Sequence, residues 1–145
     1  MLIIILTLIV GTRDYNGGGI DVISRIFEDG EVRYEAFILK VIFTAITIGA
    51  GFKGGEIIPT FFIGATLGGS LALLLGISPA FGAALGMATM FCGVTNCPIA
   101  TIFISVELFG ADVMLYYLIV AMIGFLLSGK ESLYSSQIID RSKLK

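Results

Sequence analysis

Residues 51–69, GFKGGEIIPTFFIGATLGG, bring together residue types that can hold an anion without a charged side chain. Glycines precede Pro59, and proline suits the first turn of a helix because the N–H that it lacks would be unsatisfied there in any case. The first amides of such a helix are unpaired, and the helix dipole adds roughly half a positive charge beside them. We therefore expect a helix that begins near Ile57 or Pro59, with an anion site made by its backbone.

Two acidic side chains accompany this stretch. Glu56 comes just before the expected helix, and residues 57–106 then contain no Asp, Glu, Lys or Arg until Glu107. The Glu56 side chain either faces the anion or turns away to pair with Lys53 or to cap a helix. The second reading is favoured because a carboxylate would repel an anion unless it were protonated. Glu107 is a candidate functional intramembrane acid, since such acids are rare, but its position near Gly110 fits a helix end in contact with water equally well.

The composition places these residues in a membrane protein. The chain has 145 residues, of which 57% are apolar and 14% are charged, whereas soluble chains carry roughly 25% charged residues. A soluble fold could not readily hide an uncharged stretch as long as residues 57–106, but the hydrocarbon core of a bilayer accommodates it. We therefore predict an integral membrane protein.

The same composition argues against several other functions. The net charge of −2 provides no basic surface for nucleic acid. There is no histidine, which removes the commonest general base and metal ligand. Cys92 and Cys97 are too few ligands for a zinc site, and we assign them to packing. We expect no catalytic residue, no metal and no other cofactor.

Five apolar segments must position the anion site. They are short, rich in glycine and interrupted at Pro79 and Pro98, since proline disfavours helix in the residue before it. Backbone that ends inside a membrane has to face protein or a water-filled cavity, and transporters build binding sites in this way. Small residues four apart, such as Gly64 and Gly68, let such helices approach closely. The expected segments are 36–50, 57–77, 80–95, 99–110 and 113–128.

The other parts of the chain are read from their charges and length. Residues 12–35 carry both signs of charge and are expected to form a water-exposed connection, with a short amphipathic helix at the membrane surface from Ile20 to Phe27. Lys40, near the start of the next apolar segment, is expected to snorkel to the interface. Residues 1–10 reach only about half the ~20 residues of a spanning helix, so we expect the chain to begin partway through one, with an N-terminal part missing.

Three stretches together resemble the CLC family of chloride channels and anion/proton antiporters. GFKGGEIIPTFFIGATLGG resembles the G-x-F-x-P region and the helix after it, GVTNCPIATIFISVELFG resembles a later membrane helix, and GKESLYSSQIIDR resembles the start of the last helix. The three stretches keep the order and spacing of the family from about residue 11 to the C-terminus. The family's serine motif and its gating-glutamate motif lie earlier in its chains, and neither is found in this sequence.

This resemblance implies a fold. It predicts an all-α, polytopic membrane protein with short, broken and tilted helices, in which residues 1–145 form part of a CLC-type transmembrane domain, the C-terminal half of an inverted repeat. Residues 129–145 would be the final helix and the cytoplasmic tail. CLC proteins are dimers in which each subunit has its own pore, so a second copy of the chain is an expected partner.

The resemblance also implies site residues. In the family, backbone amides at the second and third positions of G-x-F-x-P meet the anion, which places Glu56 and Ile57 there, after Gly55. The tyrosine hydroxyl that also meets the anion would belong to Tyr134. The motif departs from the common pattern because Ile57 stands where phenylalanine is usual, and Glu56 resembles the glutamate in the corresponding motif of the fluoride-exporting branch.

The expected function is transport of a halide, chloride or fluoride, across a prokaryotic plasma membrane. The transporter would be a channel or an anion/proton antiporter, with protons as a second partner and lipid around the protein. Two other classes stay open, an intramembrane enzyme and a membrane assembly module that transports nothing. An enzyme is disfavoured because Lys40 and Lys53, the available bases, are accompanied by no serine motif.

Overall fold

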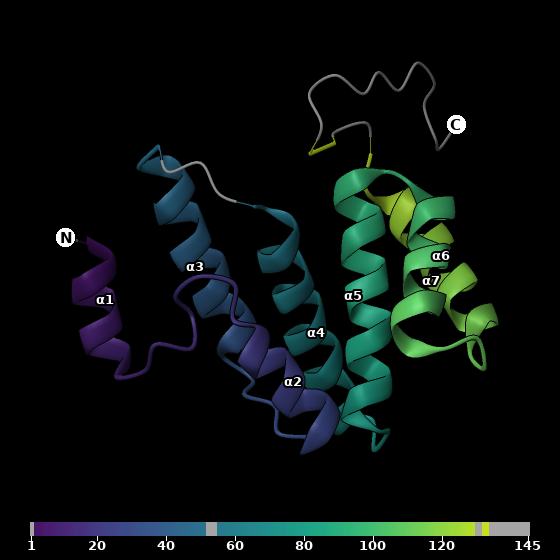
Figure 1. The fold of residues 1–145 in the computed structure, drawn as a ribbon, viewed down its shortest axis with the longest axis horizontal. Helices are drawn as coiled ribbons and strands as arrows, with labels where there is room; N and C mark the ends of the chain where they lie inside the picture. Colours follow the sequence, from purple (N-terminus) through teal and green to yellow (C-terminus); the bar gives the residue numbers. More distant parts are fainter. Residues whose placement is uncertain (1, 52–54, 130–131, 134–145) are drawn as a thin grey trace.

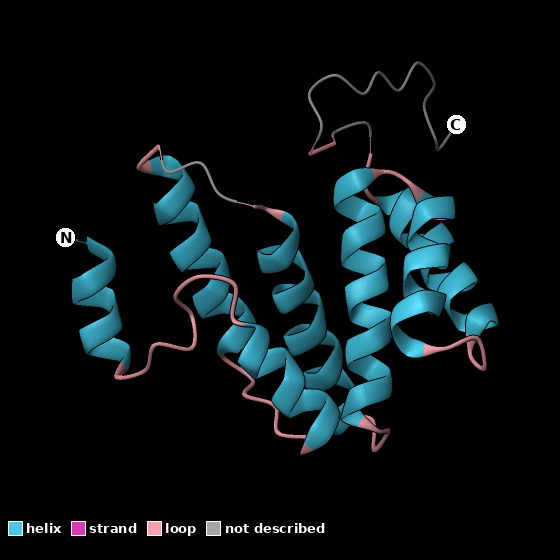
Figure 2. Ribbon diagram, viewed as in Figure 1, coloured by secondary structure: helices cyan, strands magenta, loops and turns pink. Residues whose placement is uncertain are grey.

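The computed structural model describes residues 2–51, 55–129 and 132–133, and this part of the chain is all helical (Figure 1). Figure 2 shows that the helices are joined by loops and turns without any strand among the described residues. The predicted all-α class is therefore confirmed. The helices are α1 (Leu2–Val10), α2 (Ile20–Glu28), α3 (Ala36–Gly49), α4 (Ile57–Leu74), α5 (Pro79–Thr95), α6 (Pro98–Phe109) and α7 (Met114–Leu127).

Prolines, and a residue with a positive φ angle, fix the helix boundaries that the sequence predicts. Pro79 and Pro98 are the first residues of α5 and α6, where the missing N–H of proline costs no helical hydrogen bond. Asn96 ends α5 in the left-handed conformation, with a φ of 56°. Each of the five predicted apolar segments becomes one helix, with ends that differ from the prediction by a few residues.

The helices are mostly short for membrane segments. Within the described residues, α4 is the one helix that is long and apolar enough to cross a bilayer, and α3, α5, α6 and α7 are shorter apolar helices. At 1.5 Å per residue, the 14 residues of α3 reach only about 21 Å, against a hydrocarbon core of ~30 Å. The predicted pattern of short apolar helices is thus observed.

Helices α4 and α5 lie side by side at the centre of the molecule, with α3 on one side and α6 and α7 on the other (Figure 1). Glycines bring the two backbones into contact. A Cβ atom added to Gly64 would lie 2.6 Å from the carbonyl oxygen of Gly86, and one added to Gly68 would clash with the carbonyl of Gly82. The expected close approach of helices through small residues is therefore confirmed, and it joins α4 to α5.

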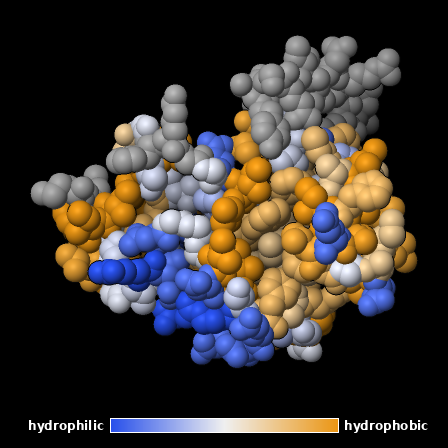
Figure 3. Space-filling view, viewed as in Figure 1, coloured by the Kyte–Doolittle hydropathy of each residue, from blue (hydrophilic) through white to orange (hydrophobic). Residues whose placement is uncertain are grey.

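The connection before α3 is anchored more deeply than the sequence predicts. Helix α2 forms as expected, but Ile26 on its apolar face is fully buried against Ala65 of α4 and Ala83 of α5. Tyr15 is also buried, with its ring 6.1 Å from the ring of Phe62. The polar residues of this region gather around α2 on one part of the surface (Figure 3). The connection is thus exposed on its polar side and packed into the bundle on its apolar side.

Apolar side chains cover much of the remaining surface (Figure 3). Among the large ones, Ile9, Leu74 and Leu127 are each more than two-thirds exposed, at 78%, 71% and 76%. Exposure of this kind costs free energy in water but not in the hydrocarbon of a bilayer. These helix faces are therefore suited to contact lipid or another apolar surface.

Candidate anion site at the start of helix α4

Helix α4 begins at Ile57, as the glycine-rich stretch predicts, and Pro59 lies in its first turn. The carbonyl of Glu56 accepts hydrogen bonds from the amide of Thr60 at 3.2 Å and from its Oγ1 at 2.8 Å. None of the described carbonyl groups accepts a hydrogen bond from the amides of Glu56 or Ile57. Both N–H groups lie at the positive end of the helix dipole.

A cavity of about 460 Å³ lies beside this helix start. Four parts of the chain form its walls: the start of α1, the connection before α2, one face of α3, and the residues around the first turn of α4. Gly55 and Glu56, two of the predicted anion-binding residues, are among the lining residues. Ile57 is not among them. The lining residues are Ile3, Tyr15, Asn16, Gly17, Gly18, Lys40, Phe43, Thr44, Thr47, Ile48, Gly55, Glu56, Ile58 and Pro59.

Lys40 is buried at the wall of this cavity, so the prediction that it snorkels to the interface is wrong. Its side chain is 1% exposed. The ammonium Nζ donates to the carbonyl oxygen of Gly17 at 2.7 Å and to that of Tyr15 at 3.2 Å. It also lies 4.7 Å from the centre of the Phe62 ring, whose face attracts a cation. The sequence predicts that water solvates the ammonium group of Lys40. In the structure, hydrogen bonds to two carbonyl groups take the place of that water.

Glycines in the connection make this arrangement possible. Gly17 and Gly19 have φ angles of 65° and 74°, in the region where residues with a side chain are strained. A Cβ atom on Gly19 would also lie 2.6 Å from the Phe62 ring. The glycine run therefore lets the connection turn against α4 and present its carbonyl groups to Lys40. Two features of the sequence could have indicated this contact: the three consecutive glycines at residues 17–19, and a lysine within an apolar helix.

The structure removes one of the roles considered for the Glu56 side chain. Glu56 is the N-cap residue of α4, but its side chain makes no capping hydrogen bond, so that part of the prediction is wrong. Pairing with Lys53 cannot be assessed because Lys53 lies outside the described residues. Glu56 is half-buried and lines the same cavity as Lys40.

Tyr134 lies outside the described residues, but the two residues before it are placed. The amide of Leu133 donates to the carbonyl of Val94 at 2.8 Å, and the hydroxyl of Ser132 donates to the carbonyl of Thr95 at 3.3 Å. After α7 the chain thus returns to the C-terminal end of α5.

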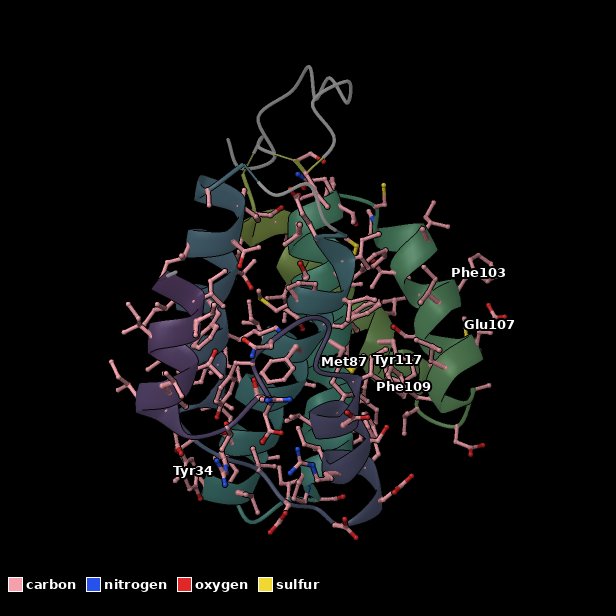
Figure 4. All side chains as sticks on the ribbon, turned by 60° about the vertical axis from the view of Figure 1, so that its left-hand side comes forward. Tyr34, Met87, Phe103, Glu107, Phe109 and Tyr117 are labelled. Carbon is pink, nitrogen blue, oxygen red and sulfur yellow. The ribbon has the colours of Figure 1, made fainter. Side chains whose placement is uncertain are left out.

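Glu107 does not join the cavity at α4. It lies in the last turn of α6 and is exposed, and it points outward beside Phe103 (Figure 4). Figure 4 also shows Phe109 and Tyr117 together on the inner side of these helices, where their ring centres are 6.2 Å apart. The position of Glu107 is the one that the helix-end reading requires.

The two cysteines are also placed, with Cys92 fully buried and Cys97 half-buried. The sulfur of Cys92 lies 3.1 Å from the carbonyl oxygen of Ala121, so this side chain packs α5 against α7. Cys97 is the N-cap residue of α6. Their places fit the packing role that the sequence assigns to them.

An all-helical fold of short apolar helices, with a cavity at a helix start, is the arrangement that the sequence predicts for a membrane transporter or channel. Residues 1–129 match the family model described as voltage gated chloride channel. The chain belongs to this family, the CLC family, and the resemblance found in its motifs is confirmed. Members of the family are multi-pass membrane channels and transporters rather than enzymes, so the enzyme alternative is excluded.

Individual relatives agree with this assignment. The chain is 38% identical over 129 residues to a chloride/fluoride channel protein of Pseudomonas syringae pv. tomato, covering 89% of this chain and 28% of the relative. It is 33% identical over 95 residues to an uncharacterized protein of Methanocaldococcus jannaschii, covering 66% of this chain and 24% of the relative.

A solved structure extends the agreement to the fold. The crystal structure of a CLC-type fluoride/proton antiporter superposes with a TM-score of 0.86 at 34% identity, over 92% of this chain and 34% of that chain. The predicted polytopic membrane fold of the CLC type is thus confirmed. This chain spans about a third or less of the length of each of these relatives.

Proposed function

We propose that this chain forms part of a CLC-type transporter that carries a halide across a membrane. The observation that supports this most directly is the cavity at the start of α4, which Gly55 and Glu56 line and beside which the amides of Glu56 and Ile57 have no described acceptor. Partial charges on backbone amides attract a small anion and still let it leave, which rapid transport requires. Membership of the CLC family supports the same function.

The proposed anion ligands are the backbone amides around Glu56 and Ile57, after Gly55, together with the hydroxyl of Tyr134. The amides are supported by their position at the first turn of α4. Tyr134 is proposed on its place in the CLC motif alone.

Fluoride is the first halide to test. One relative is named for chloride and fluoride, and a solved structure is named as a fluoride/proton antiporter. Glu56, at the position where the resemblance places the glutamate of the fluoride-exporting branch, supports the same choice. Proton coupling is proposed on the solved structure's name alone.

The proposed setting is the plasma membrane of a prokaryote, in a homodimer surrounded by lipid. The two relatives from Pseudomonas syringae and Methanocaldococcus jannaschii support a prokaryotic membrane. Dimers are typical of CLC proteins. The exposed apolar faces of the helices provide surface for lipid and for a second subunit.

Halide flux from liposomes tests the proposal. The intact protein is reconstituted, the vesicles are loaded with fluoride or chloride, and release is followed with ion-selective electrodes while external pH is recorded. We expect release of at least one halide well above the rate from protein-free vesicles, and proton uptake in step with it if exchange occurs. A protein that is folded and inserted but releases neither ion would favour the assembly-module alternative.

A further inference from the structure

A small charged cavity lies between α2 and the start of α3, away from the start of α4. Its volume is about 140 Å³. Two arginines, Arg25 and Arg33, and two acids, Asp14 and Glu31, are among its lining residues. Apart from Tyr15, it shares no lining residue with the cavity beside α4. The charged side chains of this cavity therefore belong to none of the groups assigned to the anion.

Two of these charges have no partner among the described residues. The Arg25 Nη2 lies 3.0 Å from the Asp14 carboxylate, and its Nε donates to the carbonyl oxygen of Asp21 at 3.3 Å. The side chains of Glu31 and Arg33, in contrast, form neither an ion pair nor a hydrogen bond with any described residue. The cavity thus presents a guanidinium and a carboxylate that can bind a ligand.

The cavity lies where the charged connection passes into an apolar helix. Ala36, the first residue of α3, lines it, and Ile38 and Val41 further along α3 are 51% and 46% exposed. Tyr34 is 52% exposed and lies on the outside of the molecule near this helix start (Figure 4). Tyrosine is enriched where a membrane protein crosses from water into lipid. The cavity is therefore at the level of the lipid headgroups.

We propose that this cavity binds the headgroup of a zwitterionic phospholipid with a primary amine, of the phosphatidylethanolamine type. Arg33, with the remaining N–H groups of Arg25, binds the phosphate, since a guanidinium fork matches phosphate oxygens. Glu31 accepts hydrogen bonds from the ammonium group. The acyl chains lie along the exposed apolar face of α3.

The charge and the size of the cavity favour this headgroup over others. The charges of the two arginines and the two acids cancel, which suits a zwitterion better than a headgroup with net negative charge. At about 30 Å³ for each water, the cavity has the volume of about four or five water molecules, enough for a phosphate with a short amine. Phosphatidylcholine carries the same phosphate, but its trimethylammonium group has no N–H to donate to Glu31.

Native mass spectrometry of the intact protein tests the proposal. The protein is titrated in detergent with phosphatidylethanolamine, phosphatidylcholine and phosphatidylglycerol that carry the same acyl chains, and the bound lipid is counted. We expect phosphatidylethanolamine to bind about tenfold more tightly than phosphatidylcholine, because only its ammonium forms a charge-assisted hydrogen bond. Phosphatidylglycerol should also bind more weakly than phosphatidylethanolamine.

Two variants separate the two halves of the headgroup. Arg33→Gln should weaken phosphatidylethanolamine binding about tenfold by removing a charged phosphate ligand, whereas Arg13→Gln, exposed and outside the cavity, should not. Glu31→Gln should abolish the preference for phosphatidylethanolamine over phosphatidylcholine without weakening phosphatidylcholine. Glu28→Gln, also exposed and outside the cavity, is its control.

The proposal is overturned if the unchanged protein binds phosphatidylethanolamine and phosphatidylcholine equally, or phosphatidylglycerol more tightly than either. These comparisons need no variant, so they hold even if one does not fold. It is also overturned if Arg33→Gln binds phosphatidylethanolamine as tightly as Arg13→Gln does. The site does not depend on halide transport, so headgroup selectivity without halide flux would contradict the proposed function alone.

Discussion

Lys40 and Glu56 bring opposite charges to the wall of one cavity, and only one of them could be placed from the sequence. Glu56 directly precedes a helix start that glycines and Pro59 predict. The partners of Lys40 lie 25 and 23 residues away in the chain, at Tyr15 and Gly17. Hydropathy along a helix contains no information on contacts with distant parts of the chain. It therefore predicted that Lys40 faces water at the interface, whereas the side chain is buried.

Removing the charge of Glu56 should strengthen anion binding. Glu56→Gln keeps the size of the side chain but removes a negative charge from the cavity wall, and we expect the dissociation constant for fluoride or chloride to fall by about tenfold. Isothermal titration calorimetry on the intact protein measures this. Glu28→Gln, at an exposed position at the end of α2, is the control and should have no effect. An unchanged affinity in Glu56→Gln would show that this side chain does not act on the anion and has a structural role instead.

The hydroxyl of Tyr134 should contribute directly to anion affinity. Tyr134→Phe removes a single hydrogen-bond donor to a charged ligand and keeps the ring, so we expect halide binding to weaken by about tenfold. The same calorimetric titration measures it. Tyr116→Phe, at an exposed position on α7, makes the same chemical change elsewhere and serves as the control. Equal affinities in the two variants would remove Tyr134 from the site.

At the scale of elements, the sequence predicts the helices well and their partners poorly. Proline and glycine act locally, so the starts of α5 and α6 at Pro79 and Pro98 follow from the sequence. The spacing of Gly64 and Gly68 predicts a close approach to another helix but does not say which one. The choice of α5 depends on Gly82 and Gly86, which lie 14 and 22 residues beyond their partners on α4. The burial of Tyr15, in a connection, depends on Phe43 of α3 and Phe62 of α4.

The glycine contact between α4 and α5 should be sensitive to a single methyl group. In Gly86→Ala the new Cβ would clash with the carbonyl oxygen of Gly64, so we expect a loss of about 1–3 kcal/mol in the free energy of unfolding. Gly93→Ala is a matched control on the same helix, because its Cβ would meet no atom closer than 3.9 Å. Thermal unfolding of the purified protein compares the two variants. A melting temperature that falls equally in both would show that helix propensity or handling, rather than the contact, is being measured.

At the scale of the whole molecule, polar and apolar surfaces are divided between different elements. The charged residues of the connection gather around α2, while the outer faces of α6 and α7 are largely apolar (Figure 3), with Glu107 as an exposed acid on α6. The CLC fold accounts for this division, since its helices lie in lipid and its connections meet water. Composition alone predicts the membrane environment, because the preference for lipid over water depends on the total content of apolar and charged residues and not on particular contacts.

This division predicts which positions water-soluble reagents reach. Glu28→Cys, on the exposed polar side of α2, should react readily with a membrane-impermeant maleimide in permeabilised vesicles. Leu118→Cys, 43% exposed on α7 in the isolated chain, should react at least about tenfold more slowly, because lipid or a second subunit covers it. Labelling is read by mass shift on gels after equal reaction times. Equal labelling at both positions would place α7 in water.

The backbone contact between α4 and α5 also restricts how the protein can move. Where Gly64 meets Gly86, no side chain separates the two backbones. One helix therefore cannot slide along the other at this point without moving backbone against backbone. We expect a displacement of α4 to be transmitted to α5 through this contact.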